Sequence, residues 1–169
     1  MSQTSFSINI PAYSYEGQIA DSGFTDKLTG LAEAVIPFGK LVCRSTISDE
    51  SAKGNYICRL PAASSDVAAK QVLGVAIIDQ AREQLAGQVG LAQYPIKAAC
   101  SLMRRGRIVV KVEEAVVAGD NVSIRVDTAG LGAGSFCKTV DAARIALTRA
   151  VYMNAAGING LAVVEINFI

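Results

Sequence analysis

The sequence predicts a mainly β protein, an antiparallel β-barrel or sandwich with an extended N-terminal arm. Short apolar runs of period two recur along the chain, and turn residues such as Gly, Asn, Asp and Ser separate them. No alternation of strand and helix patterns repeats, which disfavours a parallel α/β fold. The length of 169 residues fits one domain with one main core.

The first part of the chain differs in composition from the rest. Residues 1–30 are rich in Ser, Gly, Thr and Gln, and they show no sustained period of either helix or strand. Runs typical of strands begin at Ile36. We therefore expect residues 1–30 to form an extended N-terminal arm and residues 31–169 to form the β-barrel domain.

The first half of the expected domain contains three strand patterns. Residues 37–47 and 55–61 flank a polar loop and predict a first antiparallel pair. Residues 64–66, with the sequence Ser-Ser-Asp, can cap a short helical turn. Residues 72–78 are apolar on both faces, as in a buried central strand. Residues 81–93 are polar enough to leave the sheet, and a short helix is one possibility there.

The clearest strand pattern lies in the second half. Ile108, Val110 and Val112 fall on one face of a strand over residues 107–113. Residues 122–126 alternate in the same way, and the intervening Gly-Asp-Asn sequence suits a turn. The two runs are therefore predicted to be neighbouring antiparallel strands.

Three further segments complete the chain. Residues 128–135, TAGLGAGS, predict a flexible loop. Residues 142–154 fit either a helix or a strand, and their β-branched content favours a strand. Residues 161–169 alternate up to the carboxyl terminus and predict a final strand.

Composition argues against nucleic acid and membrane partners. Lys and Arg number 16 against 15 Asp and Glu, so the net charge of +1 provides no field that would attract phosphates. No apolar stretch is long enough to span a bilayer, and the first residues do not resemble a secretion signal, so a cytoplasmic origin is expected. Apolar residues make up 51% of the chain and charged residues 18%, so partners are expected to cover some apolar surface.

The residues needed for catalysis are scarce. The chain has no His, the commonest general base, and no Ser-x-x-Lys or G-x-S-x-G pattern, so we expect no enzyme and no cofactor. The spacing of Cys43, Cys58, Cys100 and Cys137 is unlike that of a metal site, and these residues are interpreted as buried thiols. Adjacent Glu113 and Glu114 would point to opposite faces and are expected to be solvated or at a strand end.

Two groups of residues are candidates for binding a protein partner. Three arginines gather in the sequence SLMRRGR; they are either a solvated strand end or partners for carboxylates on another protein. Aromatic and apolar residues of the arm either pack on their own barrel or anchor an interface. The candidate partner-binding residues are Phe6, Ile8, Tyr13, Tyr15, Arg104 and Arg105.

The order of several sequence elements resembles the structural cement proteins of tailed-phage heads. These elements are GQIADSG, IPFGKLV, VLGVAIID, GRIVVKVEEAVVAGDNVSIRV and AGINGLAVVEINF, and together they cover most of the chain from Gly17 onward. The resemblance implies a β-barrel protein that binds the outer capsid surface and stabilises the head against the internal pressure of packed DNA. It implies the major capsid protein and sister copies as partners, with a trimer favoured over a dimer, and a virion location after assembly in the host cytoplasm.

Two alternatives to the cement function remain open at the level of the sequence. Another virion component, such as a tail or baseplate β-domain, would have the same composition. A carbohydrate-binding β-sandwich is disfavoured, because no Trp and only five Tyr are present to stack on sugar rings.

Overall fold

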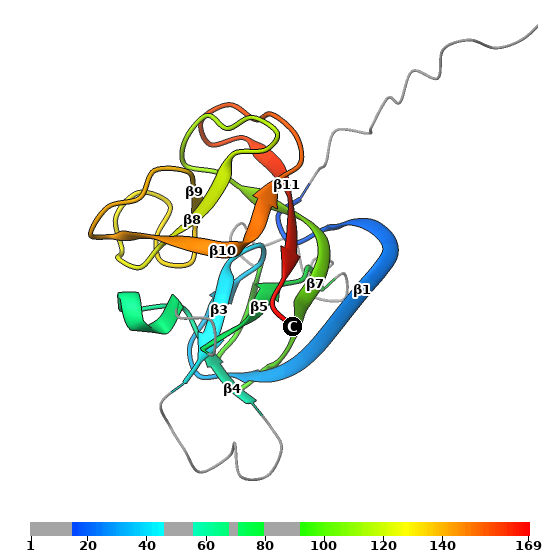
Figure 1. Ribbon diagram of the computed structural model, residues 1–169. Coiled ribbons are helices and arrows are strands. Elements are labelled where there is room, and N and C mark those ends of the chain that lie inside the picture. The colour runs from blue at the N-terminus through cyan, green and yellow to red at the C-terminus, as the bar shows by residue number, and fades with distance from the viewer. Residues whose placement is uncertain (1–14, 46–55, 68–70, 80–91) are drawn as a thin grey trace, which may run out of the picture.

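A five-stranded closed ring forms the centre of the computed structural model, which describes residues 15–45, 56–67, 71–79 and 92–169 (Figure 1). Around the ring the order is β1, β4, β3, β5, β7, and β7 pairs again with β1. The strands are β1 (Ile19–Ala32), β3 (Leu41–Arg44), β4 (Tyr56–Arg59), β5 (Val72–Ala76) and β7 (Ala99–Lys111).

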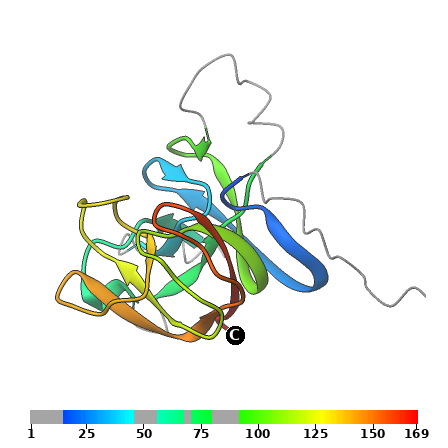
Figure 2. The ribbon, with the colours of Figure 1, turned by 90° about the horizontal axis from the view of Figure 1, so that it is seen from above.

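The long strand β7 also belongs to a second sheet beside the barrel. This sheet continues in the order β7, β11, β10, β8, β9, and Figure 2 shows it from above. Its strands are β8 (Asn121–Arg125), β9 (Phe136–Cys137), β10 (Arg144–Tyr152) and β11 (Leu161–Asn167). A small separate ladder joins β2 (Ile36–Pro37) to β6 (Gln93–Tyr94), and the 3₁₀ turn η2 spans Ser64–Val67.

The sheet is mixed, so the expected antiparallel barrel is not confirmed as such. Strands β1 and β4 run parallel, with Gly30 opposite Tyr56 and Ala32 opposite Cys58. The other pairs around the ring are antiparallel. A ring with an odd number of strands cannot alternate in direction all the way round, so at least one of its pairs must be parallel. The β1–β4 pair satisfies this requirement.

The arm expected over residues 1–30 is also corrected in its second half. Ile19–Ala32 is strand β1, an integral part of the barrel. The sequence does not reveal this strand, because it is polar and bulged: the six residues of β1 from Asp21 to Asp26 lie opposite the three residues of β7 from Arg107 to Arg105. Such a bulge interrupts the period-two pattern. Residues 1–14 lie outside the described part of the chain.

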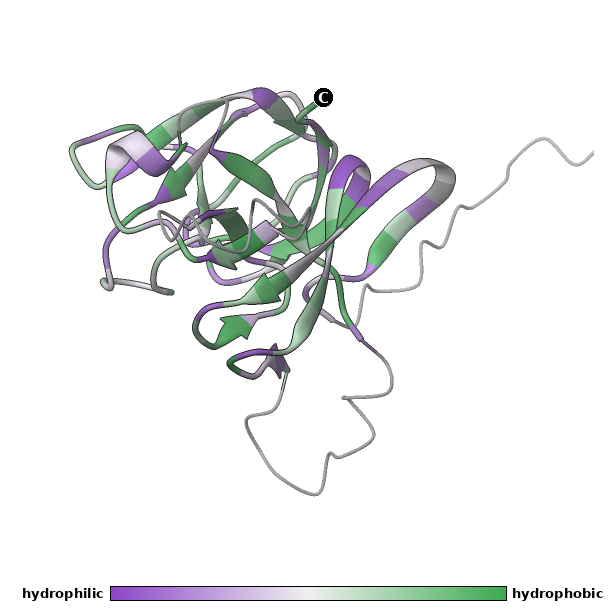
Figure 3. Cartoon of the chain, turned by 90° about the horizontal axis from the view of Figure 1, so that it is seen from below, coloured by the Kyte–Doolittle hydropathy of each residue, from purple (hydrophilic) through white to green (hydrophobic). Residues whose placement is uncertain are grey.

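Two apolar clusters share the strands β3, β5 and β7. One cluster fills the barrel under β2 and β6, and includes Phe38, Tyr94 and Leu102. The larger one lies between the barrel and the second sheet, and includes Ile108 and Ile124. Figure 3 shows that hydrophobic residues follow the strands through the molecule. Because it contributes to both clusters, β5 is buried along its whole length, as the sequence predicts for residues 72–78.

Most of the remaining strand predictions are confirmed. Strands β3 and β4 form the antiparallel pair expected from residues 37–47 and 55–61. The segment 142–154 contains strand β10 rather than a helix, and 161–169 contains the final strand β11. A short helical turn is present as η2, but it begins at Ser64 and so contains the Ser-Ser-Asp sequence expected to cap it. Most of the segment 81–93 lies outside the described residues.

The prediction that residues 107–113 and 122–126 form neighbouring strands is wrong. In the sheet, β11 and β10 lie between β7 and β8. The connection from β7 to β8 does not make a hairpin turn, because its backbone bonds to the β10–β11 connection: Val116 exchanges two hydrogen bonds with Ala156, and the Gly119 N–H donates to Tyr152 O. Those contacts carry the chain across to the far side of β10.

Gly74 provides a test of the shared strand β5. A Cβ atom at this position would lie 2.5 Å from the backbone carbonyl oxygen of Met103 on β7. We expect Gly74→Ala to lower the free energy of unfolding by about 1–3 kcal/mol, because the backbone pairing of β5 with β7 must shift. Gly157→Ala is the matched control, since no atom lies within 4 Å of its added Cβ. Equal urea midpoints for the two variants would contradict the close approach.

Candidate interaction surfaces

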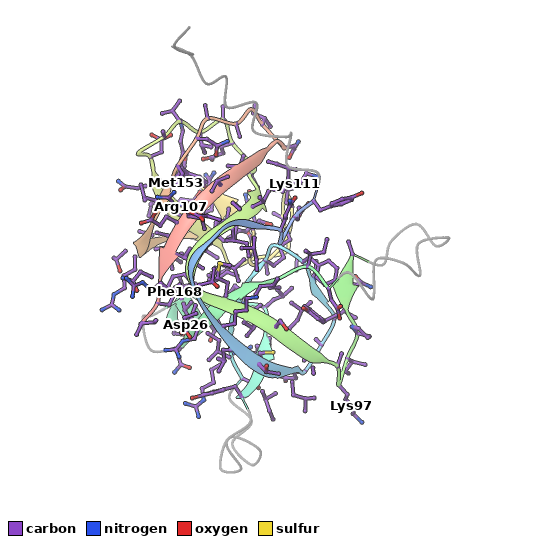
Figure 4. The ribbon with its side chains drawn as sticks, turned by 90° about the vertical axis from the view of Figure 1, so that its right-hand side faces the viewer. Asp26, Lys97, Arg107, Lys111, Met153 and Phe168 are labelled. Atoms are coloured by element: carbon purple, nitrogen blue, oxygen red, sulfur yellow. The ribbon has the colours of Figure 1, made fainter. Side chains whose placement is uncertain are left out.

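The arginines of β7 lie on a charged strip shared with β1 and β11. Arg107 contacts Glu165 at 2.9 Å and Asp21 at 3.6 Å, and Arg104 lies 3.7 Å from Asp26. Figure 4 labels Arg107 and Asp26 among the side chains of this side of the molecule. Arg105 is exposed on the same strand. The structure therefore supplies carboxylates from this chain for Arg104 and Arg107, and exposed pairs of this kind contribute at most about 1 kcal/mol to stability.

A shallow hollow of about 230 Å³ accompanies the charged strip. Its lining includes Asp21, Arg105, Arg107 and Glu165. Carboxylates and guanidinium groups alternate there, so the hollow presents no concentrated positive charge. This arrangement agrees with a protein-facing surface and gives no support to a phosphate site.

The candidate residues of the arm fall largely outside the described part of the chain. Phe6, Ile8 and Tyr13 belong to the range 1–14, of which no structure is described. Tyr15 is 54% exposed at the beginning of the described chain. Two residues further, Gly17 bonds to the barrel: its N–H donates to Val109 O, and its carbonyl accepts from Ile78 N–H. Within the described part of the chain, no hydrogen bond or ion pair joins Tyr15 to Arg104.

Glu113 lies just past the end of β7, one of the two alternatives expected for it, but its side chain is not solvated. Its side chain is 8% exposed and accepts hydrogen bonds from Arg125 at 2.6–2.8 Å. It also accepts from the Leu131 N–H at 2.8 Å. Burial by itself would raise the pKa of Glu113, but these hydrogen bonds outweigh it and lower the pKa. The carboxylate is therefore a structural anion that attaches the 128–135 loop to the end of β7.

Glu114 also fixes a loop of the second sheet through hydrogen bonds. It accepts hydrogen bonds from the Lys138 and Thr139 N–H groups and pairs with Arg144 at the start of β10. Burial opposes ionisation, yet the backbone donors lower the pKa of Glu114. The two adjacent carboxylates point to different neighbours, as the sequence predicts, and each fixes one loop of the second sheet.

A buried Lys and Ser pair lies under the 128–135 loop. The Lys40 ammonium donates to Ser135 Oγ at 2.6 Å and to Leu131 O at 3.0 Å. Ser135 is fully buried and Lys40 is 8% exposed, so no substrate can reach the hydroxyl. Burial lowers the pKa of Lys40. Some hydrolases use a Lys–Ser pair for catalysis, but this buried pair bonds to the 128–135 loop and holds it in place. The loop expected to be flexible is therefore fixed by hydrogen bonds.

Three exposed apolar side chains lie on two connections of the second sheet whose backbones bond to each other. Val117 lies between β7 and β8, and Met153 and Ile158 lie between β10 and β11; their exposed fractions are 56%, 37% and 70%. Figure 1 shows the two connections side by side at the top of the molecule. We call Val117, Met153 and Ile158 the loop-end patch. The sequence signal for it is MNAAGING at residues 153–160, which contains no charged residue.

Backbone hydrogen bonds hold the loop-end patch in place. Val116 and Ala156 bond to each other in both directions, at 2.9 and 3.0 Å. The Asn154 side chain accepts from the Val163 N–H at 2.6 Å, and Asp120 accepts from the Val117 N–H at 3.0 Å. The backbone of both connections is therefore fixed while these apolar side chains are exposed. Apolar side chains exposed in this way make the connections a candidate surface for a protein partner.

The described residues offer no chemistry for a metal or a reactive thiol. Among them, no three His, Cys, Asp or Glu side chains come together as a metal site requires. All four cysteines are free and buried. Burial raises the pKa of Cys43 and of Cys137 to about 12, so both thiols stay protonated and are weak nucleophiles. The part of the chain that the structure describes also lacks a helix with the length and hydropathy needed to cross a bilayer.

Comparison of the sequence with known families gives one match over nearly the whole chain. Residues 2–167 match the family described as "Structural cement protein (E217 gp24/Pam3 gp6)". No protein with a curated description matches the chain significantly.

The fold is similar to chains in two solved structures. One is the capsid of Myoviridae phage XM1, with a TM-score of 0.69, 17% identity and coverage of 100% of both chains. The other is the head fiber gp8.5 N base in bacteriophage phi29, with a TM-score of 0.49 and 12% identity over 86% of this chain and 96% of that chain. At these identities the first likeness shows a common fold, and the second is too distant to support an argument.

The buried Glu113–Arg125 pair predicts how stability depends on pH. A carboxyl whose pKa is lower in the folded state adds stability above its unfolded value, and this stability is lost as the pH falls through the folded value. We expect Glu113→Gln to lower the free energy of unfolding by about 1–3 kcal/mol at neutral pH, because it leaves the partly buried Arg125 with Asp127 as its remaining carboxylate partner. The loss should shrink only at pH values below the ordinary pKa of Glu, as the pH falls through the lowered pKa of the folded state and the native carboxylate also becomes protonated.

Glu165→Gln is the matched control for this experiment. Glu165 also bonds to an arginine at 2.9 Å, but its side chain is 46% exposed. Its replacement should change stability by less than about 1 kcal/mol at either pH. Urea unfolding followed by circular dichroism measures both variants. Equal losses for the two variants, or a loss at Glu113 that does not depend on pH, would count against the buried anion.

Proposed function

The chain belongs to the phage structural cement protein family, and we propose that it binds the exterior of an assembled capsid through the major capsid protein. It is a capsid-stabilising structural protein that associates with the virion capsid. In the proposal, attachment across several capsid subunits stabilises the head against the pressure of packed DNA, and assembly takes place in the host cytoplasm. The proposed role needs no catalytic group, and we infer that the protein is not an enzyme.

The observation that carries the proposed attachment is the loop-end patch. Three apolar side chains, Val117, Met153 and Ile158, are exposed on connections that hydrogen bonds fix to the sheet. A rigid scaffold loses little conformational entropy when it binds, so a small apolar surface on it contributes more to affinity. Glu113 and Glu114, on the same connection as Val117, bond to the 128–135 loop and to residues 138–139. In this proposal, capsid subunits cover the loop-end patch when the protein is bound.

The other candidate partner-binding residues are assigned to contacts between copies. We propose that Phe6, Ile8, Tyr13 and Tyr15 contact a sister subunit, and that Arg104 and Arg105 lie at the border of such a contact. Arg104 already lies near Asp26 of the same chain. In the proposed contact, a carboxylate of the sister subunit joins this pair. We propose a homo-oligomer, with a trimer as the first candidate, since closed cyclic symmetry is usual for such assemblies.

A substitution in the loop-end patch tests the attachment surface. Ile158→Asp should leave thermal stability unchanged, because the side chain is 70% exposed. It should weaken binding to heads at least tenfold, since a charge replaces an apolar contact at the interface. Val140→Asp is the matched control, because Val140 is 57% exposed on the connection between β9 and β10. Co-sedimentation with heads that lack the protein gives the affinities. Unchanged binding of Ile158→Asp would exclude the patch as the attachment surface.

The cement role also predicts a preference for the assembled shell. Contacts with several capsid subunits act together only after assembly, so binding to heads should exceed binding to soluble capsid subunits by at least 100-fold. Co-sedimentation with heads and a pull-down with soluble subunits measure the two affinities under the same buffer conditions. Equal affinity for both forms would remove the basis for a cement function.

A further inference from the structure

The first half of β10 has an open edge. Arg144–Leu147 pairs with β8, and pairing with β11 begins only at Ala150. Among the described strands, none pairs with residues 144–149 on the side opposite β8. Residues Ala146, Thr148 and Arg149 are exposed there. The backbone of this stretch can therefore accept another strand.

An apolar groove lies beside this open edge. Its volume is about 210 Å³, and its lining includes Val67, Val72, Leu147 and Phe168. Strand β10 and the turn η2 form its two sides, and Figure 1 shows η2 close to the start of β10. An open strand edge next to an apolar groove is the arrangement that binds an extended peptide: the edge bonds to the backbone and the groove receives alternate side chains.

The sequence before the described chain contains a segment that fits these requirements. In residues 5–10, Phe6, Ile8 and Ile10 alternate with Ser5, Ser7 and Asn9, so an extended conformation places the three apolar side chains on one face. The segment has six residues, as many as the open stretch 144–149. Pro11 would end a strand at this point, and no charged residue lies between Ser2 and Tyr15.

We propose that residues 5–10 of a second copy of this chain add a strand to the open edge of β10 and place Phe6, Ile8 and Ile10 in the groove. The inference deepens the proposed function by naming the contact between copies. A second copy is the chosen occupant because β1, which begins four residues after the first described residue, Tyr15, lies on the opposite side of the molecule from η2 in Figures 1 and 2. Exchange of this segment from copy to copy closes into a ring or a reciprocal pair.

A matched pair of substitutions in the segment tests the alternation. Ile8→Asp should raise the dissociation constant of the oligomer at least tenfold, because it places a charge in the apolar groove. Ser7→Asp should leave the constant within about twofold, since residue 7 faces away from the groove. Both positions lie before the described barrel, and thermal melting checks that the fold is retained. Sedimentation velocity over a range of concentrations gives the constants. Equal effects of the two substitutions, or no effect of either, would overturn the proposal.

Disulfide crosslinking identifies which copy is bound. A mixture of Ile8→Cys and Thr148→Cys chains should form a crosslinked dimer under mild oxidation. A mixture of Ile8→Cys and Lys97→Cys chains should not, because Lys97 lies far from β10 at the end of the barrel (Figure 4). The native thiols are buried and should not react. A crosslink that forms only within a chain carrying both Ile8→Cys and Thr148→Cys would show that the segment binds its own barrel, and would refute the exchange.

The capsid assay separates this inference from the proposed function. If Ile8→Asp leaves the oligomer intact while Ile158→Asp still abolishes binding to heads, the strand exchange is wrong and the cement function stands. If both variants bind heads as well as the unchanged protein while Ile8→Asp dissociates the oligomer, the exchange is correct and the attachment surface is wrong.

Discussion

The architecture depends on the closure of the barrel by β1. This strand hydrogen-bonds to β7 on one side and to β4 on the other, so neither of those strands is left with an open edge along the paired stretch. Close approach is required where the ring closes: a Cβ on Gly30 would lie 3.1 Å from both Tyr56 O and Cys58 Sγ. Closure by an odd number of strands requires a parallel pair, and this pair joins segments far apart in the sequence.

Strand β7 connects the closed ring to the second sheet. Residues of β7 from Ala99 to Ile108 pair with β1 in the barrel, and residues from Arg105 to Lys111 pair with β11, so the two pairings overlap. The second sheet is therefore attached along a strand that cannot move without opening the barrel. Glu113 and Glu114 follow directly, where the strand leaves the sheet, and connect it to the loops at 128–135 and 138–139. The exposed connections thus sit on a continuous hydrogen-bonded framework.

Local patterns were sufficient for the strands that have two apolar faces or a clear alternation, as in residues 72–78 and 161–169. They failed for β1, because a bulged strand held by backbone bonds on both sides needs few large apolar residues. The order of the strands could not be predicted from the sequence. The hydrogen bonds between Val116 and Ala156 that redirect the chain join residues 40 positions apart. The burial of Glu113 depends on Arg125 and on a loop amide, neither of which its neighbours in the sequence reveal.

The size of the loop-end patch explains why attachment should depend on assembly. A stable interface between two proteins usually buries about 800 Å² on each partner. Val117, Met153 and Ile158 can supply only a part of this area, so a single copy is expected to bind a single capsid subunit weakly. When copies are joined to one another, each bound patch raises the local concentration of the next, and the combined affinity exceeds that of any one contact. Only an assembled shell presents its subunits at the fixed spacing that such joined copies require.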